Sequence, residues 1–345
     1  MSDNTKVAYK MLASGVWRQH IDAMPLTGTR HQLSCSLELI RPRPLLRREH
    51  DVSSADVAIH QGLTLQASGH SADALECFKQ AIHDDAQNPQ AWACLAHVYL
   101  TLNRFQEALP ALDRALALDP KSAPILADRS RALRQMNRNA DALSAAQRAV
   151  ALDPALAQAH YQLAATLSMM NRYKDAIGAY ERALKCQPVF AEAQAGMGLA
   201  LTYMKKPVES IVACQRATQM DQHSALAWRG LAVALWFANR GGEAIPALEM
   251  ALSCDASDAS TWVVVALLLA DLLRYSDALV ALAHALELDP NNRQYLSLRA
   301  QLEQAQSAGL MRVAHGTGRG FGGGLLRVVG TTVSEFGKAV FKDLG

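Results

Sequence analysis

The sequence has little charge of either sign and no long apolar run. Only 19 % of its 345 residues are charged, and the formal net charge is +2. A charge this small argues against general nucleic-acid binding, which needs a dense basic surface to meet phosphates. The longest apolar run covers residues 262–270 and ends at Asp271. Because a membrane-spanning helix needs about 20 apolar residues, this run is too short to be one.

Signals for secretion and for disulfide bonds are also missing. Residues 1–15 lack the apolar segment of a secretory signal. No cysteine belongs to a Cys-x-x-Cys pair, and most lie at small-residue helical positions, so we interpret them as buried small apolar side chains in a reducing compartment. These absences predict a cytoplasmic protein. The six cysteines are Cys35, Cys77, Cys94, Cys186, Cys214 and Cys254.

Residue patterns typical of catalysis are absent too. There is no His-Glu-x-x-His, no Walker loop and no Gly-x-Ser-x-Gly. Gly318-x-Gly320-x-x-Gly323 has the spacing of a dinucleotide fingerprint, but a helical segment precedes it and no βαβ unit surrounds it. His83–Asp84–Asp85 has metal-ligand residue types, although such a run is more often a solvated helix end. We therefore predict no enzyme: no catalytic residue, no metal site and no cofactor.

The feature that is present is a period of 34 residues across 55–292. Small residues recur at two positions of every unit without a slip. A period of this length indicates that the chain is built from repeated structural units stacked on one another. The first row is Ala74, Ala108, Ala142, Ala176, Ser210, Ala244 and Ala278, and the second is Ala81, Ala115, Ala149, Ala183, Ala217, Ala251 and Ala285.

Each unit contains two segments with apolar residues at helical spacing. A polar break, Asn103–Arg104 in the second unit, separates the two segments, and Asp119–Pro120 favours a turn after the second one. The alanines of the second segment allow its helix to approach the first closely. In the second unit, one face of the first segment carries Trp92, Leu95, Ala96 and Tyr99.

These residues resemble the tetratricopeptide repeat (TPR) family. The resemblance covers seven repeats, 55–292, and implies an all-α superhelical solenoid of antiparallel helix pairs. The sequence departs from the family pattern at Ser210 and where Ala86, Gln222 and Ala256 replace a proline at the end of a unit. Residues on the pattern include Trp92, Leu95, Ala96, Tyr99, Ala108, Ala115 and Pro120, then Trp228, Leu231, Ala232, Ala244 and Ala251, and then Trp262, Ala266, Ala278, Ala285 and Pro290.

The segments outside the repeats divide into four parts. Residues 1–54 form a non-repeat segment whose basic stretch 41–48 we interpret as a solvated connector, with contact to an acidic partner or lipid headgroups as the alternative. Residues 293–308 predict a capping helix with Tyr295, Leu298, Leu302 and Ala305 on its apolar side. Residues 309–324 are a Gly-rich linker, and residues 325–345 predict a separate amphipathic C-terminal helix.

The apolar stripe of 325–344 must be buried against something. It could dock on the solenoid, insert into a partner or lie on a membrane surface. The first helix of repeat seven is apolar all round, so we expect another segment to cover Val263 and Leu267. Our hypothesis is that the tail folds back over repeats six and seven, where a helix of a partner would compete with it.

The family resemblance implies that the first helix of each repeat lines a concave groove. Aromatic residues, Met and Arg are concentrated at these positions in repeats three to six, and such residues are enriched at interfaces. For Trp236 alone, packing between repeats is an equally good explanation. The residues predicted to bind a partner are Arg131, Arg134, Tyr161, Gln162, Met169, Tyr203, Arg229, Trp236, Phe237, Val263 and Leu267.

The sequence thus predicts a non-enzymatic TPR scaffold that binds a peptide or amphipathic helix of a protein partner in the groove of repeats three to seven. Arg131 and Arg134 would meet an acidic group, and the aromatic residues would grip apolar side chains. One alternative is a membrane-peripheral assembly factor anchored by 325–344, and another is an accessory TPR subunit of a separate transferase. The residues of an acidic-tail clamp and of an asparagine ladder are missing, so neither specialisation is predicted.

Overall fold

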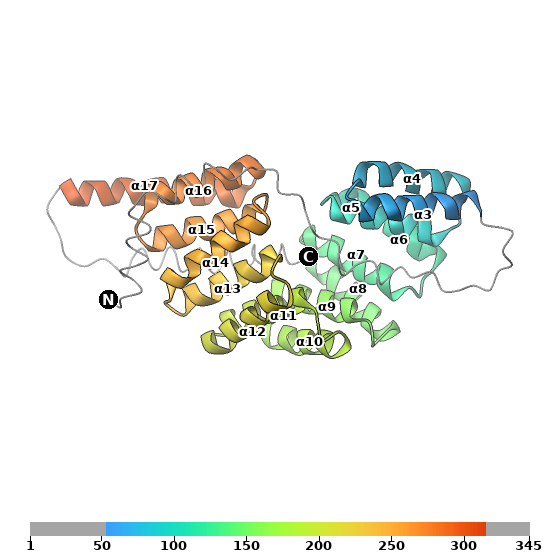
Figure 1. The fold of residues 1–345 in the computed structure, drawn as a ribbon, viewed down its shortest axis with the longest axis horizontal. Helices are drawn as coiled ribbons and strands as arrows, with labels where there is room; N and C mark the ends of the chain where they lie inside the picture. The colour runs from blue at the N-terminus through green and yellow to red at the C-terminus, as the bar shows by residue number, and fades with distance from the viewer. Residues whose placement is uncertain (1–52, 315–345) are drawn as a thin grey trace. The chain divides into compact units, whose positions relative to one another are not determined.

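The structure is a computed structural model that describes residues 53–314, with side chains up to Ser307. These residues form α-helices joined by short turns, and no strand occurs among them (Figure 1). The predicted all-α solenoid of helix pairs is confirmed for this part of the chain. The predictions for the basic stretch 41–48, most of the Gly-rich linker and the amphipathic tail 325–345 lie outside the described residues.

The chain divides into two compact units, with the boundary between Pro188 and Val189. The N-terminal unit contains α3 (Ser54–Ala67), α4 (Ser71–Asp84), α5 (Pro89–Thr101), α6 (Phe105–Leu118), α7 (Ala123–Gln135), α8 (Asn139–Leu152), α9 (Ala157–Met169) and α10 (Tyr173–Cys186). The C-terminal unit contains α11 (Ala191–Tyr203), α12 (Pro207–Met220), α13 (Ala225–Phe237), α14 (Gly241–Cys254), α15 (Ala259–Asp271), α16 (Tyr275–Leu288) and α17 (Arg293–Ala314).

The two rows of small residues hold the paired helices together. Every residue of both rows is fully buried, as expected where two helix backbones approach closely. Ser210 keeps the pattern because its hydroxyl is satisfied inside the pair: Oγ donates to the carbonyl oxygen of Gly198 at 2.8 Å. Helix α11 can come this close because Gly198 has no side chain, and a Cβ there would lie 2.4 Å from Cys214 Sγ.

The turn inside each repeat contains one residue with positive φ. In most repeats it is a residue type that tolerates this conformation, Asn or Gly. In repeats two to seven the next residue is basic, and it forms an ion pair with the acidic residue three positions later, as in Arg104–Glu107 and Arg138–Asp141. The positive-φ residues are Gly69, Asn103, Asn137, Asn171, Lys205, Asn239 and Leu273.

The three turns that lack the unit-end proline share a hydrogen bond to the next helix. Each of these three turns is followed, six residues later, by a tryptophan whose indole N–H donates to the carbonyl oxygen of the substituted residue. The bond fixes the turn against the next helix, and the ring of His160 makes the equivalent contact with the carbonyl oxygen of Pro154, where the proline is kept. The pairs are Trp92 to Ala86 at 3.0 Å, Trp228 to Gln222 at 2.8 Å and Trp262 to Ala256 at 2.8 Å.

Helix α15 is buried on every side, as its apolar sequence predicted. All residues from Ser260 to Ala270 are buried, including Val263 and Leu267. Within the C-terminal unit, α13, α14 and α16 pack against it. Helix α17 continues to Ala314, beyond the predicted 293–308, and buries Tyr295, Leu298 and Leu302 against the preceding helix.

The cysteines do not all behave as the sequence suggested. Cys94 and Cys214 are buried, and burial raises the pKa of each thiol to about 12. Cys77 and Cys254 are half-buried. The interpretation is wrong for Cys186, which is exposed because it ends α10, beyond the buried row that closes with Ala183.

Candidate functional site

The predicted binding residues of repeats three and four come from α7 and α9, which pack against each other. Arg134 and Gln162 are fully buried, Tyr161 and Met169 are buried, and Arg131 is half-buried. Arg131 and Arg134 lie one turn apart on α7, so they share a helix face. The structure therefore brings the predicted residues of the N-terminal unit to one pair of neighbouring helices.

A hydrogen bond between α7 and α9 orients the amide of Gln162. Arg134 Nη2 donates to Gln162 Oε1 at 3.3 Å, so Nε2 is the remaining donor of this side chain. Among the described residues, Nε2 is buried and has no hydrogen-bond partner. A buried donor left unsatisfied costs about 1–3 kcal/mol. An oxygen acceptor that reached this donor would therefore gain a hydrogen bond.

Polar groups that the sequence analysis did not select support this pair. Ser130 Oγ donates to the carbonyl oxygen of Ala142 at 2.8 Å, and Thr166 Oγ1 donates to that of Gln162 at 2.8 Å. The rings of Tyr161 and Tyr180 lie 6.0 Å apart. Burial raises the pKa of Tyr180 to about 12, so its phenol stays neutral. Polar residues on otherwise apolar helix faces are the signal that could have identified Ser130 and Thr166.

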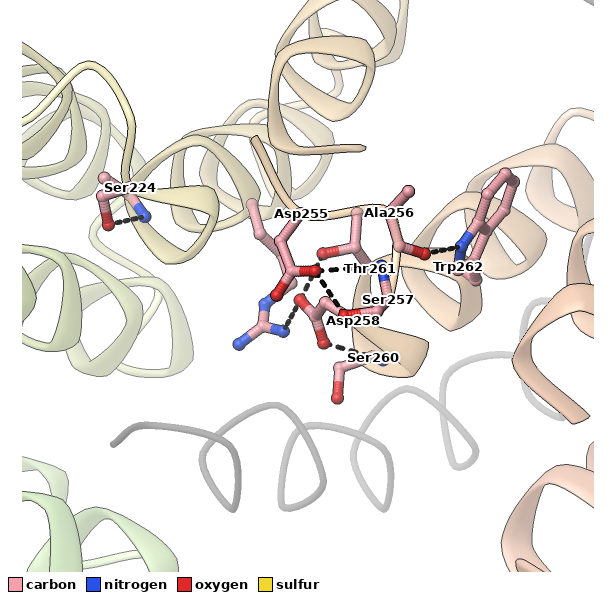
Figure 2. A network of polar contacts seen from close by, with 10 residues as sticks. Ser224, Asp255, Ala256, Ser257, Asp258, Ser260, Thr261 and Trp262 are labelled. Atoms are coloured by element: carbon pink, nitrogen blue, oxygen red, sulfur yellow. Dashed lines mark hydrogen bonds and ion pairs between the residues drawn. The ribbon is translucent and has the colours of Figure 1, made fainter. Parts of the chain in front are cut away.

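In the C-terminal unit, Arg229 is part of a network at the start of α15. Its Nη1 donates to Asp258 Oδ2 at 2.5 Å. Figure 2 shows Asp258 bonded to the first turn of α15: Oδ1 accepts the backbone N–H of Ser260 at 3.0 Å, and Oδ2 accepts the hydroxyl of Thr261 at 2.6 Å. The carboxylate is therefore the N-cap of α15 as well as the counter-ion of a buried guanidinium.

This network gives Arg229 a structural role that its sequence position did not suggest. The side chain is buried, and its Nε has no hydrogen-bond partner within the described part of the chain. Contact of Arg229 with a partner stays a prediction. Asp258 was not predictable as part of this site, because it ends the preceding repeat, outside the positions assigned to the groove.

The aromatic residues of repeats five and six form a cluster at the ends of α11 and α13. The ring of Phe237 lies 5.8 Å from those of Tyr203 and Trp236, and both contacts are edge-to-face. Trp236 Nε1 donates to Asp271 Oδ2 at 3.0 Å. Phe237 is 38 % exposed, so this cluster is partly at the surface, whereas Val263 and Leu267 of α15 are buried.

Between Ser53 and Ala314, none of the helices combines the length and apolar character that crossing a membrane requires. In the same range, no three side chains of His, Cys, Asp or Glu come together as metal ligands would.

Family models described as tetratricopeptide repeat match residues 60–123, 209–259 and 157–188. These ranges fall on the helix pairs of both units. The chain is a tetratricopeptide repeat protein. None of the curated proteins matches this TPR chain in sequence.

Solved structures resemble this TPR protein in fold. A tetratricopeptide repeat protein from Parabacteroides merdae has a TM-score of 0.58 at 17 % identity, covering 72 % of this chain and 99 % of its own. The Cut9–Hcn1 hetero-tetramer of the APC/C gives 0.59 at 17 % identity, covering 72 % of this chain and 49 % of that one. The type IV pilus biogenesis factor PilW gives 0.52 at 16 % identity, covering 59 % and 94 %.

Similarity at this level of identity establishes the fold alone. TPR proteins are generally non-enzymatic scaffolds that bind protein partners, and the family and the fold support a protein-interaction scaffold here.

Proposed function

We propose that this TPR protein binds a peptide or helix of a protein partner, and that the partner presents a carbonyl or carboxylate oxygen to α7 and α9. The observation that carries the proposal is the buried Nε2 donor of Gln162 beside the guanidinium of Arg134. A partner's oxygen would satisfy this donor and lie next to a positive charge. Arg131 lies one turn before Arg134 on α7 and is only half-buried, so it is the more accessible of the two arginines.

The C-terminal unit would contribute apolar contacts to the same partner or to another one. Tyr203, Trp236 and Phe237 combine large contact area with partial exposure, which is typical of residues that dominate binding energy. We also propose that the protein is not an enzyme and acts in the cytoplasm, as its sequence predicts.

The test uses short random peptides selected for binding to the full-length protein. The proposal expects the selected peptides to share an acidic residue or a free C-terminal carboxylate. Gln162→Glu replaces the donor with an acceptor and should weaken their affinity about tenfold to a hundredfold. The same change should not lower stability, because the new carboxylate pairs with Arg134.

Arg131→Ala should weaken the same peptides, whereas Arg148→Ala, on the exposed face of α8, serves as the matched control. Peptides without an acidic group, or an affinity that Gln162→Glu leaves unchanged, would contradict the proposal.

The tail 325–344 has a proposed place in this scheme. We propose that it docks on the C-terminal unit beside α15, the apolar first helix of repeat seven, where it would add to the cover over Val263 and Leu267. Hydrogen exchange on the full-length protein and on a truncation ending at residue 314 tests this. Faster exchange of Ala259–Asp271 after truncation is expected, and unchanged exchange would argue against tail docking.

A further inference from the structure

The aromatic cluster of repeats five and six continues to the turn of repeat seven. We call this surface the aromatic edge, and it consists of Tyr203, Trp236, Phe237, Asp271 and Leu273. They come from the ends of α11, α13 and α15 and from the turn that follows α15. Phe237 is 38 % exposed, Leu273 is 70 % exposed, and Asp271 is also exposed. Large apolar side chains exposed together commonly mark an interaction site.

The carboxylate of Asp271 has no counter-charge within the described residues. It accepts the indole N–H of Trp236 through Oδ2 and takes part in no ion pair there. The basic residues that begin α12, α14 and α16 are already paired: Lys206 with Glu209, Arg240 with Glu243 and Arg274 with Asp277. Lys205, which precedes Lys206 in the turn of repeat five, also has no ion pair among the described residues, but it lies two repeats away, roughly 20 Å at the usual helix spacing.

Leu273 is unusual for its position. It has φ +60°, where the corresponding residues of the other repeats are Gly, Asn or Lys. A left-handed backbone is unfavourable for a leucine, and exposure means that this side chain gains little by burial in the fold. Strained residues of this kind are concentrated at functional sites.

We infer that the aromatic edge docks a segment of a second protein that presents an arginine next to an aliphatic residue. The inference rests on the proposed function in that it names a partner chemistry for the C-terminal unit. The guanidinium pairs with Asp271 and stacks on the exposed ring of Phe237, and the aliphatic side chain covers Leu273. Arginine fits better than lysine because its planar group can stack and donate hydrogen bonds at the same time.

The experiment follows the indole N–H resonances of the full-length protein by NMR. The Trp236 signal is assigned with Trp236→Phe, and two probes are titrated, acetyl-Leu-Arg-Leu-amide and acetyl-Leu-Gln-Leu-amide. We expect the arginine peptide to shift the Trp236 signal with an affinity about tenfold higher than that of the glutamine peptide. Asp271→Asn should remove this difference, whereas Glu181→Gln, at an exposed acid of α10, should preserve it.

Leu273→Asn supplies a second variant with no risk to the fold, because Asn occupies this position in four other repeats. It should weaken both peptides equally. Equal responses to the two peptides, or a difference that survives Asp271→Asn, would overturn the inference. Gln162→Glu should leave these titrations unchanged and Asp271→Asn should leave acidic-peptide binding unchanged, so the failure of one proposal is distinguishable from the failure of the other.

Discussion

Replacing Asp258 should destabilise the C-terminal unit more than any ordinary N-cap substitution. The carboxylate caps α15 through Ser260 and Thr261 and neutralises Arg229. Loss of a cap costs about 1 kcal/mol, whereas removing one partner of a buried ion pair costs about 3–5 kcal/mol. The guanidinium is almost fully buried, with 2 % of the side chain exposed. We therefore expect Asp258→Ala to cost about 3–5 kcal/mol.

Two companion variants separate the contributions. Asp258→Asn retains a capping side chain of similar quality, so its cost should report the unpaired charge. Arg229→Met leaves Asp258 without its counter-ion, but this carboxylate is 17 % exposed and still accepts the bonds of Ser260 and Thr261, so the variant should cost less than Asp258→Ala. In the double variant Asp258→Ala with Arg229→Met, only the lost cap remains, about 1 kcal/mol.

Urea unfolding of the full-length protein measures these differences, and hydrogen exchange of the α15 amides localises them. The double variant should be more stable than Asp258→Ala alone. If the two single costs simply add, the ion pair contributes nothing and this reasoning is refuted.

Three further changes test other parts of the structure. Gly198→Ala should cost about 1–3 kcal/mol of stability, because its Cβ would strike Cys214 Sγ. Gly178→Ala should instead stabilise the protein by about 0.5–1 kcal/mol, because nothing lies within 4 Å of the added Cβ. Urea unfolding measures both changes. Burial raises the pKa of Glu192 above its ordinary value, and Asp221 adds to the shift. The free energy of unfolding of the C-terminal unit should therefore rise as pH falls through the raised pKa of Glu192. Glu192→Gln should stabilise the unit at neutral pH and make its stability depend less on pH. A stability that depends more steeply on pH in this variant would contradict the predicted direction of the pKa shift. Iodoacetamide followed by peptide mass spectrometry should label Cys186 and spare the buried Cys94; equal labelling would contradict the burial.

The features predictable from sequence are those that repeat. Three features recur at a fixed spacing: the alanine rows, Asn103 and its equivalents, and the Asp–Pro turns. Each repeat therefore carries the same residues for close helix packing and for its turns. The helix pairs and their buried faces follow directly from that repetition. The burial of α15 was predictable for a similar reason, since Val263 and Leu267 leave no polar side for water.

The candidate sites depend on single residues from different repeats. Arg134 meets Gln162 and Arg229 meets Asp258 across 28 and 29 residues of sequence, and neither contact is repeated elsewhere in the period. The sequence selected Arg134, Gln162 and Arg229 by their helix positions but could not tell that their polar groups bond within the fold. A strained Leu273 is likewise invisible until the backbone angle is known.

The most direct test of the central claim is NMR of the Gln162 side-chain amide in glutamine-labelled protein, with Gln162→Met for assignment. On saturation with a selected acidic peptide, we predict a large shift of the Gln162 Nε2 resonance, because this donor gains its missing acceptor. The exposed amide of Gln80 on α4 should not move. A saturated complex in which the Gln162 amide remains unchanged would show that α7 and α9 do not form the partner site.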